Sequence, residues 1–474
     1  MKKRIISLLM AGILGICVFA GCGQKEEAAP AEKSEGSEQS STESDSAEPA
    51  REESQEAEAD IDRNVEATIR FAWQSMGGSI KEQLLLGAID QLEEMYPNVT
   101  VEIENAESGK YASKISMDVS SDNTCDVFSF WRPEASYGTD KFIEAGALAD
   151  LSELLEDDLL KGKIEDSAIS TCSYKGTFYG VPENYAFIVM LANTEVLADC
   201  GLEVPTTWDE WIASMDVIKE HGYIPWGIST KAFASGWERP LGYVLDRYLG
   251  KNGETGWRNE DVLEAFAGNI HFNTPEGIEA CNKLHDLCAG NAAGDAMTLD
   301  DTQATSKYFN NGKAAYWVNG TYAIENIDEG IREKCVTMVF PEIPGAPYNE
   351  PIVDKDVTGM YYVSSKAWSD PVKKQIIYDL FTILYSDEFI DKYFYEALNL
   401  LPLKDFELDA ERIGKTIADA KVIADSSEMV KWPLGRANPE NKEAFYSVYT
   451  DFWAGKYTGE EFATKLDEIF YNGN

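Results

Sequence analysis

Three tryptophans stand next to side chains that form hydrogen bonds, and the pairs are Trp73 with Gln74, Trp131 with Arg132, and Trp237 with Glu238. An indole ring is a flat apolar surface, whereas the neighbouring amide, guanidinium and carboxylate groups form directional hydrogen bonds that are strong where the group is charged. A pyranose ring offers matching surfaces, because its C–H groups form an apolar face and its hydroxyls a polar rim. The pairs therefore indicate a site for a polyhydroxylated ligand.

Each ring also has a plainer interpretation, because large aromatic side chains most often pack in a core. Core packing is the favoured interpretation for Trp208 and Trp211, which follow Thr206 and Thr207 in a helical pattern. Arg239 suits either an acidic group of a ligand or an ion pair within the protein.

The sequence favours binding over catalysis. The histidines, His221, His271 and His285, are far apart and lack metal-ligand spacing, and the sequence contains no G-x-S-x-G elbow and no phosphate-binding loop. We therefore expect no catalytic metal and no cofactor. An enzymatic alternative stays open, because Glu183 and Glu238 would suit a glycoside hydrolase if they flanked one bond.

Two further groups of residues have the types found in a metal site or a disulfide. The segment Asp354-Lys355-Asp356 lacks the remaining ligands of a calcium loop. Residues 64–474 contain six cysteines without a C-x-x-C pair, and we expect them to be small buried side chains, with a disulfide as the alternative. These cysteines are Cys125, Cys172, Cys200, Cys281, Cys288 and Cys335.

Alternating strand and helix patterns must position these residues. TIRFAWQS (68–75) predicts a buried strand, IKEQLLLGAIDQLEEMYP (80–97) a helix and VTVEIEN (99–105) a half-exposed strand. CDVFSFW (125–131) predicts another strand and FIEAGALADLSELL (142–155) another helix. This order predicts an α/β sheet with parallel strands and crossover helices.

The rest of the body is mostly helical. Residues 205–222 predict a helix with Thr206 or Thr207 as its N-cap, and residues 274–290 predict one that begins at Thr274 with Pro275 in its first turn. Residues 359–365 predict a strand, and residues 370–398 predict a pair of helices. In the strand-like run around Tyr316 and Trp317, alternation predicts that one ring faces inward.

The N-terminus carries an export signal. Lys2, Lys3 and Arg4 precede an apolar run that ends at Gly21-Cys22, and this run is shorter than the roughly 20 residues that span a bilayer. The ending Phe19-Ala20-Gly21-Cys22 resembles a bacterial lipobox, although Phe19 stands where Leu is usual. We expect removal of residues 1–21 and acylation of Cys22, with an ordinary signal cleaved after Ala20 as the alternative.

Residues 22–63 are rich in Glu, Ser and Ala and predict a disordered acidic tether. The 14 acidic and 4 basic residues of 23–63 contribute −10 and the leader contributes +3, so the total of −42 leaves −35 on residues 64–474. A body this acidic is repelled by nucleic acid, and we expect no nucleic-acid partner. Its length of some 411 residues predicts two lobes.

Three phrases of the body resemble the sugar-binding solute-binding proteins of ABC importers, in the family that contains maltose-binding protein. YKGTFYGVPENYAFIVMLANTEVLADCGLEVPTTWDEW (174–211) is similar to the segment with an interlobe crossover and a later Thr-Trp helix start. KYFNNGKAAYWVNGTY (307–322) resembles the Gly-Lys-Ala-Ala and Gly-aromatic phrase. VTGMYYVSSKAWSDPVKKQIIYDLFTILYSDEF (357–389) resembles the strand–helix return that ends in Asp-Glu-Phe.

The resemblance implies a fold of two α/β lobes, joined by hinge strands and separated by a ligand cleft. One lobe would comprise residues 64–185 and 357–400, and the other residues 186–356 and 401–474. The chain would then cross between the lobes three times.

The resemblance also implies further ligand-binding residues, which are Glu183 at the interlobe crossover, Asn319 and Tyr322 at the Gly-aromatic turn, and Trp432 in a late loop. Tyr322 stands where the maltose-binding relatives often have Trp, so the preferred sugar stays open.

The expected function is therefore a lipid-anchored, monomeric, non-enzymatic receptor on the outer face of the cell membrane. It would capture a carbohydrate, most simply an oligosaccharide, and deliver it to the transmembrane subunits of an ABC permease. The alternatives are a secreted glycoside hydrolase and a binding protein of the same fold for a solute that is not a sugar.

Overall fold

A computed structural model of the chain describes residues 62–133, 137–232, 234–250 and 258–471. The predicted signal peptide, the lipidation site Cys22 and nearly all of the predicted tether lie outside the described residues. The described residues belong to one compact unit that begins at Asp62. None of the helices in these ranges combines the length and apolar character needed to cross a bilayer.

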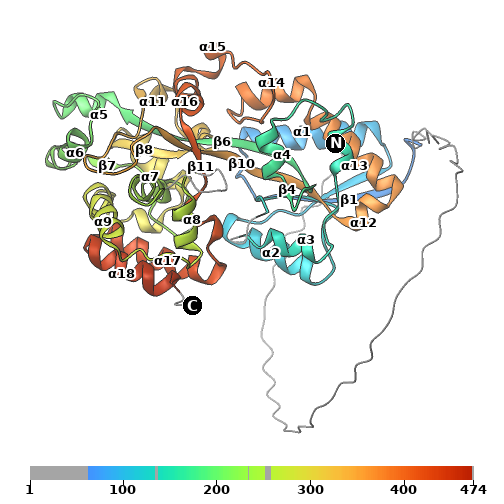
Figure 1. The fold of residues 1–474 in the computed structure, drawn as a ribbon. Coiled ribbons are helices and arrows are strands. Elements are labelled where there is room, and N and C mark those ends of the chain that lie inside the picture. The colour runs from blue at the N-terminus through green and yellow to red at the C-terminus, as the bar shows by residue number, and fades with distance from the viewer. Residues whose placement is uncertain (1–61, 134–136, 233, 251–257, 472–474) are drawn as a thin grey trace, which may run out of the picture. The chain divides into compact units, whose positions relative to one another are not determined.

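A central mixed sheet with helices packed around it confirms the predicted α/β class (Figure 1). The strand order is β2-β1-β3-β10-β6-β8-β7, while β11 pairs with β10 and β9 pairs with β6. The strands are β1 (Ala67–Ala72), β2 (Val99–Ile103), β3 (Val127–Phe130), β6 (Gly180–Asn193), β7 (Ile224–Trp226), β8 (Ala314–Gly320), β9 (Cys335–Met338), β10 (Ile352–Val363) and β11 (Glu428–Val430). As predicted, β1 is parallel to both β2 and β3.

We call the elements around β1, β2 and β3 the first lobe and those around β7, β8 and β9 the second lobe. The helices of the first lobe are α1 (Ile80–Met95), α2 (Ser108–Ser120), α3 (Thr139–Glu144), α4 (Asp166–Thr171), α12 (Ser365–Ser369), α13 (Pro371–Leu384) and α14 (Asp387–Tyr395). The strands β4 (Ser173–Tyr174) and β5 (Thr177–Phe178) form a short antiparallel hairpin that is separate from the central sheet.

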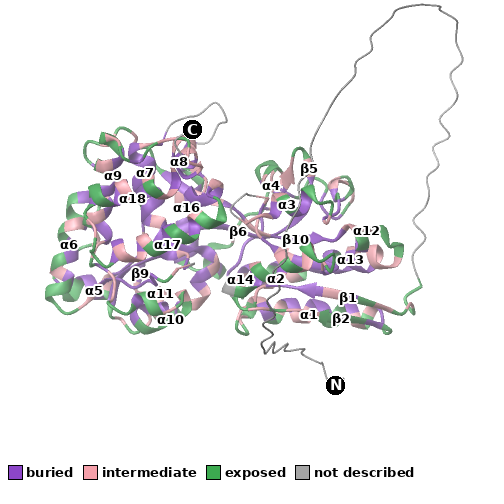
Figure 2. Cartoon of the chain, turned by 90° about the horizontal axis from the view of Figure 1, so that it is seen from below, coloured by how far each residue is buried: buried purple, intermediate pink, exposed green. Residues whose placement is uncertain are grey.

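The second lobe carries the remaining helices. They are α5 (Thr194–Asp199), α6 (Trp208–Glu220), α7 (Arg239–Tyr248), α8 (Glu260–Phe266), α9 (Pro275–Cys288), α10 (Asp301–Ala304), α11 (Glu329–Arg332), α15 (Ala410–Ile413), α16 (Lys415–Asp425), α17 (Pro439–Trp453) and α18 (Gly459–Phe470). Buried side chains concentrate along the sheet and on the helix faces turned toward it (Figure 2).

Two long strands join the lobes. The first part of β6, up to Phe187, pairs with β10, and its last part, from Ile188, pairs with β8 and β9. A third connection runs alongside, because the Tyr185 amide donates to the Leu400 carbonyl over 2.8 Å. These backbone hydrogen bonds define the hinge region from which both lobes extend.

Local sequence signals account for several helix ends. Thr207 forms a capping box with Glu210 at the start of α6, and Thr274 caps α9 with Pro275 in the first turn, as predicted. The predicted helix over 142–155 is wrong as a single element, because α3 ends at Glu144 and Gly146 adopts a φ of +72°. That left-handed conformation favours glycine and terminates the helix.

Side-chain burial corrects one expectation and confirms two others. Tyr316 and Trp317 are both buried, because β8 is covered on both faces rather than on one. Trp208 and Trp211 pack in the second-lobe core, as predicted. All of the body cysteines are buried free thiols, as predicted.

Candidate functional site

Three aromatic rings form a continuous stack that joins the two lobes. Trp131 follows β3 in the first lobe, Tyr137 lies in the same lobe just before α3, and Trp432 follows β11 in the second lobe. The Trp131 and Tyr137 ring centroids lie 5.0 Å apart, the Tyr137 and Trp432 centroids 5.5 Å apart, and each pair is tilted by 14°. Lys442 of α17 places its Nζ 4.8 Å from the Tyr137 ring centroid. We call these four residues the aromatic stack.

Glu238 fixes the second-lobe end of the stack. The Trp432 indole N–H donates to the Glu238 carboxylate over 2.8 Å, and the Tyr446 hydroxyl forms a hydrogen bond with the same carboxylate. Glu238 is 3% exposed, and its burial raises the pKa of its carboxyl group. The buried carboxylate therefore holds the edge of Trp432 and leaves the ring face for stacking.

Arg239 is engaged in an ion pair within the second lobe. Its guanidinium lies 2.5 Å from the Asp354 carboxylate and donates to the Tyr322 hydroxyl over 3.3 Å. A Cβ on Gly320 would lie 2.2 Å from the Tyr322 ring, so only glycine lets this ring fold back against the strand end. The cavity beside this ion pair measures about 10 Å³, which suits one water molecule rather than a sugar.

Asp356 on β10 contacts charged residues of both lobes. Arg132 of the first lobe donates to its carboxylate over 3.5 Å and Thr171 donates over 2.7 Å, while Lys431 of the second lobe forms an ion pair with it. Asp356 is 4% exposed and Arg132 is 6% exposed. We call these four residues the hinge cluster, and it lies next to the stack because Arg132 and Lys431 directly adjoin Trp131 and Trp432 in sequence.

Glu183 lies on β6 in a second buried cluster. The Lys81 ammonium is 2.9 Å from its carboxylate, Ser129 donates to the same carboxylate, and the Tyr393 hydroxyl donates to the Glu183 carbonyl over 2.7 Å. Burial by itself lowers the pKa of Lys81, but the charge of Glu183 raises it above its usual range, so the ammonium stays charged. Gly359 on β10 leaves room for this carboxylate.

The structure places the remaining sequence-predicted residues away from the stack. Trp73 is 1% exposed and donates its indole N–H to Glu82, and Gln74 is half-exposed beside it. Trp237 is fully buried against Tyr446 and Tyr449 of α17. Asn319 is buried at the end of β8, where its side chain accepts a hydrogen bond from the Gly320 amide.

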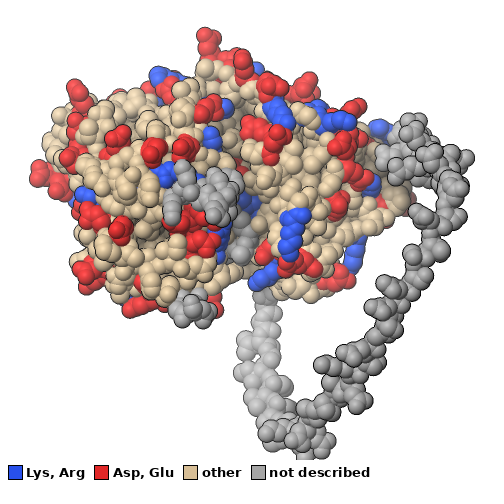
Figure 3. Space-filling view, viewed as in Figure 1, with Lys and Arg blue, Asp and Glu red and all other residues tan. Residues whose placement is uncertain are grey.

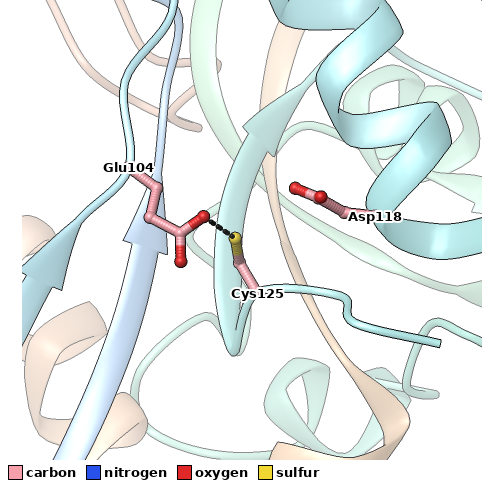
Figure 4. A group of neighbouring side chains, drawn as sticks. All are labelled: Glu104, Asp118 and Cys125. Atoms are coloured by element: carbon pink, nitrogen blue, oxygen red, sulfur yellow. Dashed lines mark hydrogen bonds between the residues drawn. The ribbon is translucent and has the colours of Figure 1, made fainter. Parts of the chain in front are cut away.

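One group of donor atoms in the described part of the chain has the composition of a metal site. Glu104, Asp118 and Cys125 converge in the first lobe (Figure 4). However, the Lys114 ammonium lies 2.7 Å from Glu104 and 2.6 Å from Asp118, so a lysine supplies the positive charge there. Burial raises the pKa of the Cys125 thiol to about 12, so the sulfur adds no charge to this group at neutral pH.

Several residues of the stack and the hinge cluster were not identified from the sequence, chiefly Tyr137, Lys442 and Lys431. Each of them has at least one partner that lies far away along the chain. Tyr137 carried a weak signal, because it lies six residues after Trp131 in the same interstrand segment. Lys442 carried none, since a lysine on an amphipathic helix is normally a solvated residue.

The comparisons with solved structures show the fold. A chitin oligosaccharide binding protein superposes with a TM-score of 0.72 at 19% identity, covering 85% of this chain and 98% of that chain. A structure from work on xylan utilization by Caldanaerobius polysaccharolyticus gives 0.71 at 20% identity, covering 85% and 99%. An ABC substrate-binding protein from Listeria monocytogenes in complex with cycloalternan gives 0.61 at 17% identity, covering 85% and 98%. The two-lobed solute-binding fold expected from the sequence is therefore confirmed.

No curated protein matches the chain. Residues 77–388 match the family model described as bacterial extracellular solute-binding protein, and this match covers most of the folded body. The matched range includes both long hinge strands, β6 and β10, and the stack residues Trp131 and Tyr137. The other two stack residues, Trp432 and Lys442, follow it in the sequence. The chain therefore belongs to the bacterial extracellular solute-binding protein family.

Proposed function

We propose that this protein captures a carbohydrate, most simply an oligosaccharide, and delivers it to the transmembrane subunits of an ABC permease. The aromatic stack is the observation that carries the proposal, because Trp131 and Trp432 present rings from opposite lobes about the same axis. Stacked rings with charged neighbours suit the C–H face and the hydroxyl rim of a pyranose. Structural relatives with carbohydrates in their titles support the same class of ligand.

Capture works through unequal affinity for two arrangements of the lobes. A sugar that takes the place of the Tyr137 ring between Trp131 and Trp432 contacts both lobes only when they are close together, so binding favours that arrangement. The hinge of β6, β10 and the Leu400 segment absorbs the motion, as in other hinge closures. The permease then recognises the ligand-bound arrangement.

The lobe boundaries and the anchor belong to the same proposal. One lobe comprises residues 64–185 and 357–400, and the other comprises residues 186–356 and 401–474. The exchange of β6 partners between Phe187 and Ile188 supports the first boundary. Acylated Cys22 holds the monomeric body at the outer membrane face through the acidic tether, since two acyl chains are enough for stable anchoring.

We infer that the protein releases its ligand unchanged. Glu183 is neutralised by Lys81 within the first lobe, and Glu238 is buried in hydrogen bonds to Trp432 and Tyr446. Neither carboxylate is arranged as the acid or nucleophile of a glycoside hydrolase, which would need both groups at one bond. The ion pair of Arg239 likewise favours an uncharged ligand over an anionic solute.

Calorimetry against glucose-, xylose- and N-acetylglucosamine-based saccharides of one to six units tests the proposal. We expect stoichiometric binding of one of these series, recovery of the intact saccharide, and a smaller radius of gyration by small-angle scattering at saturation. Amino acids, polyamines and metal ions serve as the control panel. Binding from the control panel alone, or cleavage of the saccharide, would contradict the proposed function.

A further inference from the structure

A second pocket lies in the second lobe, outside the aromatic stack. Its volume is about 560 Å³, within the range of about 300 to 1,000 Å³ that is usual for small-molecule sites. It lies between helix α17, the segment that follows β7, and the short helical turn Ala296–Thr298. The residues used below are Lys231, Met297, Glu443, Tyr446, Ser447 and Asp451.

Helix α17 contributes residues both to this pocket and to the stack. Lys442 contacts the Tyr137 and Trp432 rings, while Glu443 and Tyr446, within about one helical turn, line the pocket. Tyr446 and Trp432 also form hydrogen bonds with the same Glu238 carboxylate. The pocket therefore begins about one helical turn along α17 from the stack residue Lys442.

Three of the polar side chains that line the pocket are not engaged by other side chains. Within the described residues, Lys231, Glu443 and Ser447 are exposed and form no side-chain hydrogen bond or ion pair. Met297 is 37% exposed and offers an apolar surface to a C–H face.

The charges around the pocket cancel, although the protein as a whole carries −42. Lys231 and Lys456 match Glu443 and Asp451 in number, and Lys456 lies 2.6 Å from Asp451. Among the charged side chains on the face that Figure 3 shows, acidic ones predominate. A balanced pocket on so acidic a protein suits an uncharged, hydroxyl-rich segment better than a cationic one.

We propose that this pocket, which we call the α17 groove, binds the distal units of an extended neutral oligosaccharide whose first units occupy the aromatic stack. The inference rests on the proposed function and specifies its ligand as a chain of several sugar units. Glu443, Lys231 and Ser447 bind hydroxyls of the distal units, and Met297 packs against a ring face.

The test measures how affinity depends on chain length. In the wild-type protein, we expect the Kd to fall at least about tenfold between the shortest and the longest members of the saccharide series that binds. Ser447→Trp fills the groove, so the ratio of these two Kd values should approach one. Ala444→Trp is the matched control, because Ala444 is exposed on the same helix and does not line the groove.

Each possible result of these measurements either supports or contradicts the proposed groove. An equal loss of affinity at every chain length in Ser447→Trp, or an unchanged ratio, would overturn the α17 groove while leaving carbohydrate capture intact. A collapsed ratio in Ala444→Trp would do the same. If no saccharide binds the wild-type protein, the proposed function fails and the groove loses its assigned ligand with it. Thermal melting of both variants shows whether each one is folded.

Discussion

Trp131 and Trp237 look alike in the sequence, since each precedes charged residues, but their surroundings differ. Trp131 is partly exposed and stacks on Tyr137 with nearly parallel planes. Trp237 is completely buried and packs against Tyr446 and Tyr449. A ring that remains partly exposed can change partners and stack on a ligand, whereas a fully buried ring contributes packing energy.

We therefore expect one alanine substitution to affect ligand binding and the other to affect stability. Trp131→Ala should weaken saccharide binding by about 1 to 3 kcal/mol, with little change in melting temperature. Trp237→Ala should lower the free energy of unfolding by about 3 to 5 kcal/mol, because it leaves a large cavity. Calorimetry and urea unfolding of both variants measure the two effects. Unchanged affinity in Trp131→Ala would remove this ring from the binding site.

Sequence reasoning at the residue scale identified side chains more readily than their partners. Trp131, Glu238 and Trp432 were predicted, and the structure brings the last two into a hydrogen bond. Tyr137 and Lys442 were missed, because their contacts join segments separated by some 300 residues. Composition and periodicity describe neighbours along the chain, whereas a stack between lobes depends on the tertiary arrangement.

Among the elements of the first lobe, Glu104 links β1 and the end of the edge strand β2 to α2. It follows β2, and its carboxylate accepts from Arg70 of β1 and from Lys114 of α2, each over 2.7 Å. Burial by itself raises the pKa of Glu104, but these two hydrogen bonds lower it to about 2, from an ordinary value of 4.5. The carboxylate therefore stabilises the folded state only while it is ionised.

This shift predicts a pH-dependent loss of stability. Because the folded-state pKa lies below the unfolded value, the stabilisation is complete above pH 4.5 and disappears as the pH falls toward 2. Glu104→Gln should therefore cost about 1 to 2 kcal/mol at pH 7, after allowance for solvent screening, and progressively less below pH 4.5. Urea unfolding from pH 7 to pH 3 measures the difference.

Glu102→Gln is the control for this prediction, because Glu102 is exposed on β2, two residues before Glu104, and forms no ion pair with a described residue. Its stability should follow that of the wild type at each pH. A cost for Glu104→Gln that stayed constant between pH 7 and pH 3 would show that the effect comes from packing rather than from charge.

Helix starts were predicted well wherever the capping residue and its partner both lie close together in the sequence. Helices α6 and α9 begin at the predicted threonines, because a capping side chain and its partner lie within four residues. The interruption over 142–155 was missed, because apolar spacing continued through Gly146, where the backbone turns. The burial of both faces of β8 was missed because helix coverage is a property of the whole lobe.

At the scale of the whole molecule, the hinge cluster connects both lobes to one residue of β10. Lys431→Met removes the second-lobe partner of Asp356 and leaves its contacts with Arg132 and Thr171 in the first lobe. We expect the lobes of the free protein to separate more readily and the saccharide affinity to fall about tenfold, since a ligand must then work against the shifted equilibrium.

Small-angle scattering of the free protein and calorimetry with the bound saccharide measure these two effects. Lys415→Met is the matched control, because Lys415 is an exposed second-lobe lysine whose ion pair with Asp419 stays within α16. An unchanged radius of gyration together with unchanged affinity in Lys431→Met would show that the hinge cluster has no influence on lobe closure.

The lobe arrangement was predicted from the resemblance of three phrases to a family, not from periodicity. Strand and helix patterns established the α/β class and the parallel β1, β2 and β3. They did not reveal that β10 runs antiparallel between β3 and β6. A strand pattern specifies which faces are buried, but its partner in the sheet is chosen by contacts across the whole chain.

The position of β10 has a consequence for biogenesis. This strand, residues 352–363, lies between β3 and β6, which precede it by well over a hundred residues. A nascent polypeptide that ends before β10 therefore leaves one edge of β3 and the first part of β6 without their partner strand. The strands of the two lobes can therefore be joined into one sheet only after β10 has been synthesised.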